Sequence, residues 1–501
     1  MTDKRGPRKS ISDLDKVETE DLLRAFREIK QLDINDKDSF FYIASIHAAP
    51  ISKEESQRVW CHHGTVLFPT WHRPYMDALE QALRKHVPEQ RQENFRFPYW
   101  NSSLGEFPSI FMEENVTIDG KEVPNPLLSY TPPIDVIVVD DKGVEQVVIP
   151  KNTPTERGWS WIEDKELKKR MYLETIKGAL QRISVPAFQR CLKTKEYRAF
   201  SNTGFDGAES QSLENPHNSL HLLSGGSPKD FVDYSEVPLL EKVPDTSAQL
   251  GERELFKKYA SFSARNAAAR LAQWDTYTTR TKLFHWIEIH WGALDPWKRA
   301  MSVVDISAFD PIFYFHHLNI DRFYWQWQEI NGVENWEPEP PPQNPNAPDP
   351  WNATGIRGID QNERLSLQTL LPPFDFTAGA VKDPKVLGIS YDPVEEPSLE
   401  AEPLPSVVFI GNKTEHRGAF SAHVWEETED GKLDIVGSEH AFTRLFSSTC
   451  PNCRANPIVP LHVVITGASN VARFEAFPGR PRKFVGGIES AKPVNIPALA
   501  Q

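Results

Sequence analysis

Soft metal ligands are concentrated in one short stretch of this 501-residue chain. Residues 61–72 read CHHGTVLFPTWH and contain one cysteine and three histidines among apolar neighbours. Imidazole and thiolate are typical ligands of zinc, copper and iron, whereas magnesium and calcium prefer oxygen ligands. The stretch contains no carboxylate, so its composition is typical of a transition-metal site.

Helical periodicity turns six of the 15 histidines toward an apolar interior. His72 shares a helix face with Met76, Leu79 and Leu83. His47 and His317 lie on apolar faces in the same way. The pair His217 and His221 is four residues apart, which places one ring above the other on a single face.

A single histidine on such a face is more often a hydrogen-bonded core residue than a ligand, and most of the others keep that interpretation. Two of them, His62 and His316, adjoin stronger candidates but should point about 100° away from them on a helix. Six imidazoles buried for unrelated reasons would each need a separate hydrogen-bond partner, which favours a shared metal site.

The ligand types narrow the choice of metal to copper or zinc. The segment HNSLH, residues 217–221, lacks the glutamate of HExxH, so it does not indicate a zinc protease. Two ions sharing six neutral imidazoles suit copper, which cycles between two oxidation states.

Helical patterns must position these residues. They dominate residues 10–100 and return at 160–200, around 214–223 and at 250–330. In the segment around 214–223, Asn215 as N-cap and Pro216 as first helical residue predict the helix start. Two segments interrupt this pattern: the β-like run IDVIVVDD at 134–141 and the proline-rich segment 335–352, which predicts a surface loop.

A proline- and acid-rich segment at 392–405 predicts a linker between two domains. Short β-branched runs separated by turns follow it, which is typical of an all-β module. The sequence therefore predicts a helical domain over 1–391 and a β-rich domain over 406–501.

The charge balance excludes some partners. With 56 basic and 70 acidic residues the net charge is −14, so we expect no nucleic-acid or anionic-membrane partner. No apolar run is long enough to span a bilayer, and the N-terminus lacks a secretory signal. Four cysteines make no disulfide framework, and a cytoplasmic protein is expected.

Two longer motifs carry a family resemblance. HHGTVLFPTWHRPY and DPIFYFHHLNIDRFYWQW resemble the two copper-binding signatures of type 3 copper proteins, which comprise tyrosinases, catechol oxidases and haemocyanins. The second fits the family pattern D-P-x-F-x-x-x-H-x-x-x-D with Asp310, Pro311, Phe313, His317 and Asp321. The resemblance covers about residues 8–391, and fungal tyrosinases with a C-terminal shielding domain extend it to the end of the chain.

The resemblance implies a mainly α fold, a four-helix bundle around a binuclear copper site, followed by a β-sandwich-like C-terminal domain. It also implies that Arg8 packs near Tyr391, where the catalytic domain closes. The ligands would be His47, His63 and His72 for one copper, and His217, His221 and His317 for the other.

Cys61 stands two residues before His63, as in fungal relatives whose cysteine sulfur is bonded to the histidine ring. The resemblance thus predicts a thioether between Cys61 and His63. A reduced buried thiol is the alternative.

The implied activity is phenol oxidation with O2: hydroxylation of monophenols and oxidation of o-diphenols to o-quinones. Glu214 and Asn218 flank His217, where the family holds a water that takes the phenol proton, although Glu214 could instead cap its helix. Val304 occupies the family's gate position, and a valine leaves access for monophenols. A catechol or o-aminophenol oxidase without monophenolase activity, and a haemocyanin-like oxygen carrier, are the alternatives.

The resemblance further implies that the chain is latent until its C-terminal domain is displaced. Phe442, with Phe446 as second choice, would plug the phenol site, although an ordinary core phenylalanine is the alternative. Cys450 and Cys453 form a CPNC motif that would help to load copper. The expected partners are small phenols, and a homo-oligomer is compatible with the sequence.

Overall fold

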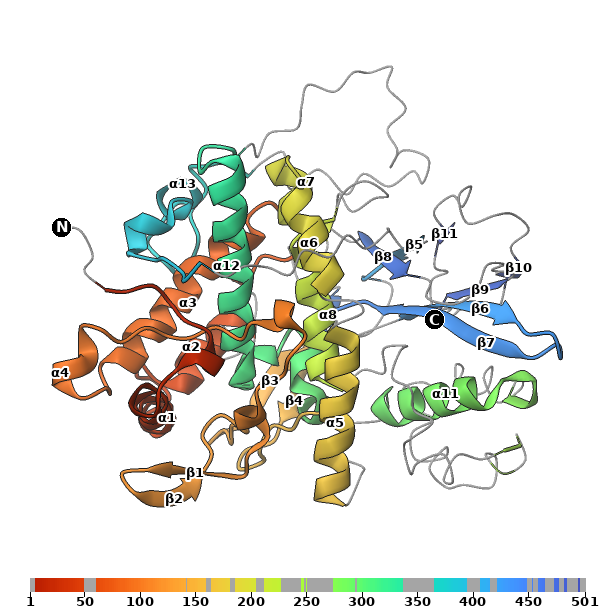
Figure 1. The fold of residues 1–501 in the computed structure, drawn as a ribbon, viewed down its shortest axis with the longest axis horizontal. Coiled ribbons are helices and arrows are strands. Elements are labelled where there is room, and N and C mark those ends of the chain that lie inside the picture. Colours follow the sequence, from red (N-terminus) through yellow and green to blue (C-terminus); the bar gives the residue numbers. More distant parts are fainter. Residues whose placement is uncertain are drawn as a thin grey trace.

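A computed structural model describes most of the helical part of the chain and parts of the C-terminal sheets (Figure 1). The described residues are 5–48, 60–140, 142–158, 164–180, 185–203, 211–226, 245–246, 249, 274–292, 295–336, 365–393, 406–414, 421–447, 453, 458–464, 473–476, 482–483 and 494–495. Among them, no helix combines the length and the hydropathy that a bilayer crossing requires.

Helices make up most of the described chain before residue 393, as the sequence predicts. The α-helices are α1 (Lys16–Ile29), α2 (Phe40–His47), α3 (Phe68–Arg84), α4 (Glu89–Gln92), α5 (Lys165–Ala179), α6 (Val185–Lys193), α7 (Tyr197–Ser201), α8 (Glu214–Ser224), α11 (Thr279–Gly292), α12 (Ile312–Asn331) and α13 (Ala378–Val381). Short 3-10 helices include η9 (Pro296–Ser302) and η10 (Ser307–Phe309).

Local sequence explains where the first helices begin. The Asp15 side chain caps α1, and Glu18 completes a capping box. Ser39 caps α2 by accepting a hydrogen bond from the Tyr42 backbone N–H. In α3, Pro74 falls in the second turn of the helix without ending it.

Strands form two hairpins in the helical part and two small sheets after the linker. The hairpins pair β1 (Asn115–Ile118) with β2 (Lys121–Pro124) and β3 (Val136–Val139) with β4 (Glu145–Ile149). The C-terminal sheets have the orders β10-β9-β6-β7 and β11-β5-β8. Their strands are β5 (Ser406–Asn412), β6 (Ser421–Glu427), β7 (Leu433–His440), β8 (Ile458–Val464), β9 (Arg473–Ala476), β10 (Arg482–Lys483) and β11 (Val494–Asn495).

The main hydrophobic core joins α1, α2, α3, α8 and α12. Of the C-terminal residues that the structure describes, only Phe442 and Leu445 are buried in it. Helix α11 lies apart, beside β6 and β7 (Figure 1). Although α11 precedes the linker in sequence, Tyr277 next to it stacks on Trp425 of β6, with ring centroids 5.2 Å apart.

Several expectations can be compared with this fold. Arg8 donates a hydrogen bond to the Tyr391 hydroxyl at 3.0 Å, so the predicted contact is present. The predicted N-cap Asn215 is wrong, because α8 already begins at Glu214. The linker (394–405) and most of the proline-rich loop (337–352) lie outside the described residues.

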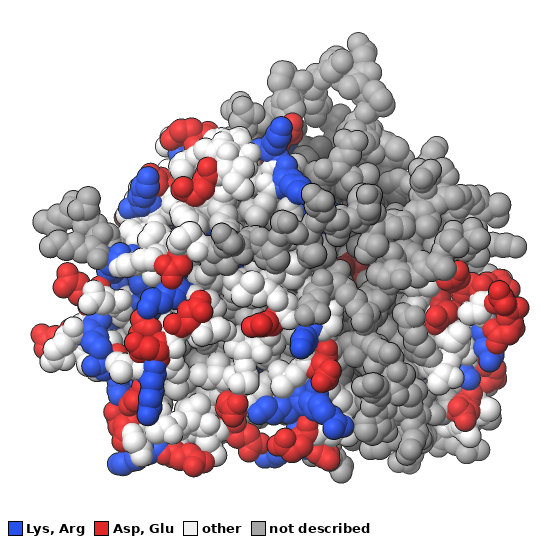
Figure 2. Space-filling view, in the orientation of Figure 1, with Lys and Arg blue, Asp and Glu red and all other residues white. Residues whose placement is uncertain are grey.

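Charges of both signs alternate over the helical part of the face drawn in Figure 2, and acidic side chains gather at its β6–β7 end. Glu427 at the end of β6 and Glu429 and Asp430 in the turn that follows are exposed. The described part of this face therefore carries mixed charge rather than a broad basic area.

Candidate metal centre

Four helices and one loop bring the six predicted histidines together. His47 is the last residue of α2, His72 lies in the second turn of α3, and His317 lies in α12. The pair on α8 is His217 and His221, and His63 precedes α3. Five of these residues are fully buried, and His63 is partly exposed although its Nε2 atom is buried.

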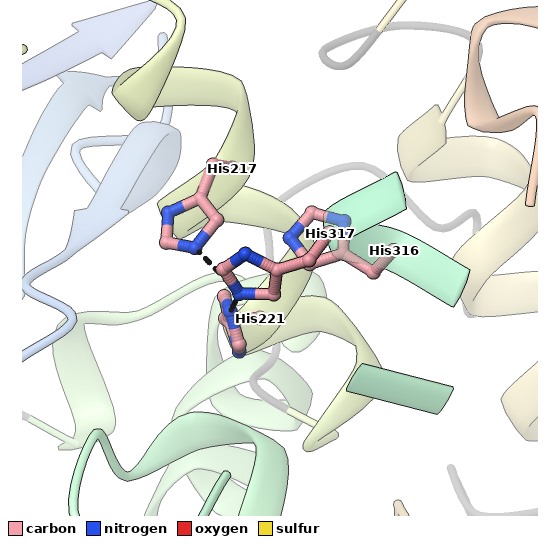
Figure 3. Close-up of side chains that lie close together, drawn as sticks. All are labelled: His217, His221, His316 and His317. Atoms are coloured by element: carbon pink, nitrogen blue, oxygen red, sulfur yellow. Dashed lines mark hydrogen bonds between the residues drawn. The ribbon is translucent and has the colours of Figure 1, made fainter. Parts of the chain in front are cut away.

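One group of rings converges on His317 (Figure 3). Its Nε2 lies 3.2 Å from Nε2 of His217 and 3.1 Å from Nε2 of His221. Two nitrogens bound tetrahedrally to one ion at roughly 2.0–2.1 Å would be about 3.3 Å apart. The three nitrogens are therefore spaced as ligands of a single metal ion.

The second group consists of His47, His63 and His72. The ring centroids of His47 and His63, and of His63 and His72, are each 5.3 Å apart. Ligand atoms of His47, Cys61 and His63 lie within 4.8 Å of one another. The Nε2 atoms of all three histidines are buried and accept no hydrogen bond from any described residue. Three buried nitrogens without a partner would be costly unless they bind something.

The two groups are adjacent. The rings of His72 and His317 stack with centroids 4.5 Å apart, and those of His63 and His217 are 5.5 Å apart. Two ions held by these groups would lie side by side between four helices, in the space among the six rings that we call the metal cavity.

Oxygen acceptors fix which ring nitrogen faces inward. The Nδ1 atoms of His47, His72 and His221 each lie 2.8–3.1 Å from a backbone carbonyl oxygen, of Val304, Phe68 and Met301 respectively. A neutral imidazole that donates through Nδ1 leaves the Nε2 lone pair for a metal. Asn218 has the same effect on His217, because its Oδ1 lies 2.9 Å from Nδ1.

Burial also keeps these rings neutral. Desolvation lowers the pKa of His72 to about 3 and, together with neighbouring imidazoles, holds the pKa of His47, His63, His217, His221 and His317 well below 6.5. Neutral imidazole is the form that binds metal, so the site is ready to bind near neutral pH.

The acidic residues of the second motif are structural. Asp310 forms a buried ion pair with Arg157, and Asp321 forms one with Arg73 at 2.7 Å. Asp321 also accepts a hydrogen bond from the Tyr391 hydroxyl. The donors at the two groups are the imidazoles and the Cys61 sulfur, which fit copper or zinc better than magnesium or calcium.

Glu214 is buried beside the first group. Its carboxylate accepts hydrogen bonds from the backbone N–H of Gly64 at 2.7 Å and of Thr203 at 3.0 Å. Burial raises the pKa of Glu214, and these two bonds partly oppose the shift. Because Gly64 follows His63, the carboxylate also anchors the loop that carries His63.

A loop of the C-terminal part reaches the metal cavity. The Phe442 ring stacks on His221 with centroids 4.2 Å apart and lies 5.9 Å from His63 and 5.8 Å from His217. Phe446 is partly buried against the same core. Cys453 is buried, and Cys450 lies outside the described residues.

His316 does not point away from the cluster, so that expectation is wrong. Its ring nitrogen lies with those of His217, His221 and His317, all within 4.8 Å (Figure 3). The rings of His316 and His217 stack with centroids 5.1 Å apart. His316 and His317 are consecutive in α12, and both reach the cluster because α8 packs beside α12. The α8 rings of His217 and His221 contact both residues.

Sequence reasoning missed the groups that orient the ligands. The carbonyls of Val304, Phe68 and Met301 leave no sequence signal, because every residue carries one. Arg444 and Asp305 form a buried ion pair beside His47, and the Arg444 charge helps to lower the pKa of that ring. Neither residue belongs to a motif, so nothing in the sequence marks them.

Known proteins are similar to this chain in sequence. The family model described as the common central domain of tyrosinase matches residues 37–330. A tyrosinase of Hahella sp. is 26% identical over 91% of this chain and 85% of its own length. A tyrosinase of Aspergillus oryzae is 27% identical over 90% and 87%.

Solved structures show the same fold. A tyrosinase of Burkholderia thailandensis at low pH superposes with a TM-score of 0.60 at 21% identity, covering 92% of this chain and 91% of that one. The holo-protyrosinase of Aspergillus oryzae gives a TM-score of 0.56 at 18% identity, with 91% and 86% covered.

Proposed function

The chain belongs to the tyrosinase family of type 3 copper proteins and is a tyrosinase-type oxidoreductase, and from this we propose that it hydroxylates monophenols and oxidises the resulting o-diphenols. The observation that carries the proposal is the pair of adjacent three-histidine groups, one with closely spaced Nε2 atoms and one with buried, unpartnered Nε2 atoms. We assign His47, His63 and His72 to one copper and His217, His221 and His317 to the other. When bound, the copper pair supplies two-electron redox chemistry with O2.

The helices that carry the ligands support the finer fold assignment. α2, α3, α8 and α12 hold five of the six histidines, as a four-helix bundle around the metal pair would require. The two C-terminal sheets, which contact each other through β7 and β8, support the proposal of a β-sandwich-like shielding domain over 406–501.

Proton transfer is the step that the protein must supply for monophenols. Ionising a phenol with a pKa near 10 costs about 4 kcal/mol at pH 7. Glu214, a buried carboxylate with a raised pKa, and Asn218, which contacts His217, support a water-mediated base at this position. Val304, at the gate position, offers only a small side chain to an entering ring.

The position of Phe442 supports latency. A ring stacked on His221 occupies the space that a phenol ring would need above that ligand. We therefore propose that the intact chain is latent, with Phe442 as plug rather than Phe446, and that cleavage within 392–405 activates it.

Two covalent or metal-handling features remain proposals. The proximity of Cys61 to His63 supports a thioether between them. The peptide that spans both residues should then lack two hydrogen atoms and resist thiol alkylation; full alkylation in copper-loaded protein would reject the bond. Replacing Cys450 or Cys453 by Ala should slow copper uptake without abolishing catalysis by preloaded enzyme.

The test of the function is an oxygen-uptake assay on copper-loaded protein, intact and cleaved in the linker, with tyrosine and with a catechol. We expect both substrates to be oxidised, faster after cleavage. Oxidation of the catechol alone would identify a catechol oxidase, and reversible O2 binding without turnover would identify an oxygen carrier.

A further inference from the structure

Helix α2 places a proposed copper ligand at its last residue. The final carbonyls of a helix lack intrahelical donors, and helix ends fray unless another group caps them. Here the His47 carbonyl accepts a hydrogen bond from the Cys61 backbone N–H at 3.3 Å. The next carbonyl, of Ala48, accepts one from Nη2 of Arg444 at 2.9 Å. A side chain of the C-terminal part therefore caps α2.

The same guanidinium is fixed by a buried carboxylate. Nε and Nη2 of Arg444 donate to Oδ1 of Asp305 at 2.9 and 2.5 Å. The backbone N–H of Leu445 donates to the other oxygen, Oδ2, at 2.8 Å. Asp305 is 3% and Arg444 is 7% exposed. Both carboxylate oxygens are thus satisfied by two consecutive residues of one loop.

Asp305 in turn adjoins the group that orients the His47 ring. The preceding carbonyl, of Val304, lies 3.1 Å from Nδ1 of His47. Arg444 therefore holds both segments on which His47 depends: the end of α2 that carries it and the turn before η10 that fixes its ring.

The loop around Arg444 has two separate contacts with the cavity. Phe442 stacks on His221, which belongs to one three-histidine group, and its ring centroid lies 5.9 Å from that of His63 in the other. Arg444 supports His47, which belongs to the other. A contact that blocks substrate and a contact that supports a ligand are thus two residues apart.

We propose that Arg444 is a positioning residue for His47, so that the C-terminal part strengthens the binding of the copper at His47, His63 and His72 while it blocks the site. This inference rests on the proposed function, because it assumes copper at that group. It implies that displacing the C-terminal part opens the site and weakens the binding of one of its two copper ions.

Single-copper backgrounds of the full chain test the proposal. His221→Ala leaves the His47 group as the intact site, and His72→Ala leaves the His217 group. Cu(I) affinity is measured at equilibrium against a chelating competitor, because an equilibrium constant does not depend on how easily the chelator enters. We expect Arg444→Gln to weaken copper about tenfold in the His221→Ala background, the size typical of a lost ligand-orienting contact. In the His72→Ala background we expect less than a twofold change.

Two further variants separate positioning from other effects. Phe442→Ala, in the same loop, should change the affinity of the His47 group less than twofold. Arg444→Gln can destabilise the fold by leaving Asp305 buried and unmatched. The double variant Arg444→Gln/Asp305→Asn removes that charge but does not restore the cap of α2, so the copper affinity of the His47 group should stay reduced.

The outcomes distinguish this inference from the proposed function. Three outcomes would overturn the role of Arg444 without affecting the proposed function. They are equal weakening of copper binding in both backgrounds, unchanged affinity in the His221→Ala background, and full recovery in the double variant. A wild-type chain that binds fewer than two copper ions would overturn the proposed function and this inference with it.

Discussion

The helical part and the C-terminal part contribute to the cavity in different ways. The helical part supplies all six proposed ligands. Backbone carbonyls orient three of them, and for His47 and His221 the carbonyl belongs to a distant segment. The C-terminal part has its own sheets and packs against α11, and it reaches the buried core through the loop that carries Phe442 and Leu445.

This difference separates two kinds of control. Ligand positions depend on packing that is spread over a large core, so a change there should alter the chemistry itself. On the proposed function, access depends on the Phe442 ring, so removing that ring should alter how much enzyme is open while leaving the chemistry intact. Variants in the two parts can be compared directly.

The largest difference is expected between two buried histidines, one from each part. His317→Ala removes the ring on which His217 and His221 converge, so one copper and all oxidase activity should be lost. His423→Ala, in β6, removes an equally buried ring from the C-terminal sheet and should leave both coppers bound. Metal analysis and oxygen uptake measure both effects. Retention of two coppers by His317→Ala would contradict the ligand assignment.

Acid should destabilise the metal-free helical part. Burial lowers the pKa of His316 and of His72 to about 3, below the 6.5 of an unfolded histidine. The unfolded chain therefore binds more protons below pH 6.5, and stability that is present above this pH is lost as pH falls toward 3. Each such histidine should cost about 2 kcal/mol between pH 6.5 and about pH 5, at ~1.4 kcal/mol per pH unit.

Urea unfolding of chelator-treated protein between pH 7.5 and 5 measures this loss. His316→Phe keeps a ring in place but removes one titrating group, so its stability should fall less steeply with acid. Stability that stays constant over this range would contradict the burial of neutral imidazoles.

Glu214→Gln should affect the two substrate classes differently, whereas changes in the 441–447 loop should affect how open the site is. A carboxamide cannot take the phenol proton, so monophenol hydroxylation should fall about 10²-fold, in the range of general-base loss. Catechol oxidation needs less help from this base and should fall less than about threefold. Asn218→Ala should act in the same direction. Equal losses for both substrates, with copper content unchanged, would mean that Glu214 acts only as a structural residue through its contact with Gly64.

The sequence was sufficient for the elements that carry strong local patterns. The helical faces of His72 and His317 and the strand at 136–139 lie where periodicity predicts them. Periodicity failed where packing of a second helix determines which side chains meet. His316 contacts histidine rings of α8 although its neighbour His317 also does so. The predicted cap at Asn215 was wrong because α8 begins at Glu214, two residues before the predicted first helical residue Pro216. The Glu214 carboxylate bonds the backbone N–H groups of Gly64 and Thr203 rather than those of its own helix.

Contacts between distant segments could not be predicted. Arg444 and Asp305 are 139 residues apart, and both are ordinary residue types outside any motif. The packing of α11 on the C-terminal sheet, across the predicted linker, has the same origin. Such contacts depend on tertiary geometry that a single sequence does not reveal.

Phe442→Ala should activate the intact chain several-fold for monophenols and catechols alike, because it opens the cavity without touching the base. Phe446→Ala is the matched control from the same loop and should activate less. Rates of intact and linker-cleaved protein, each copper-loaded, measure the effect. Equal rates for wild-type and Phe442→Ala in the intact chain would contradict the plug.

The smallest effect is expected where α11 meets the sheet. The Thr281 hydroxyl donates to Oδ1 of Asp434 at 3.0 Å and accepts from the backbone N–H of Ile435 at 2.9 Å. Thr281→Val keeps the shape but leaves that buried N–H without its acceptor, which should cost about 1–3 kcal/mol. Faster hydrogen exchange of β7 amides would report the loss.

Because this contact is remote from the cavity, Thr281→Val should keep both coppers and raise activity less than Phe442→Ala does. Thr175→Val is the matched control: it removes a buried hydroxyl that donates to the Met171 carbonyl within α5, and should leave β7 exchange unchanged. Activation by Thr281→Val equal to that of Phe442→Ala would mean that α11, rather than the loop at 441–447, holds the cavity closed.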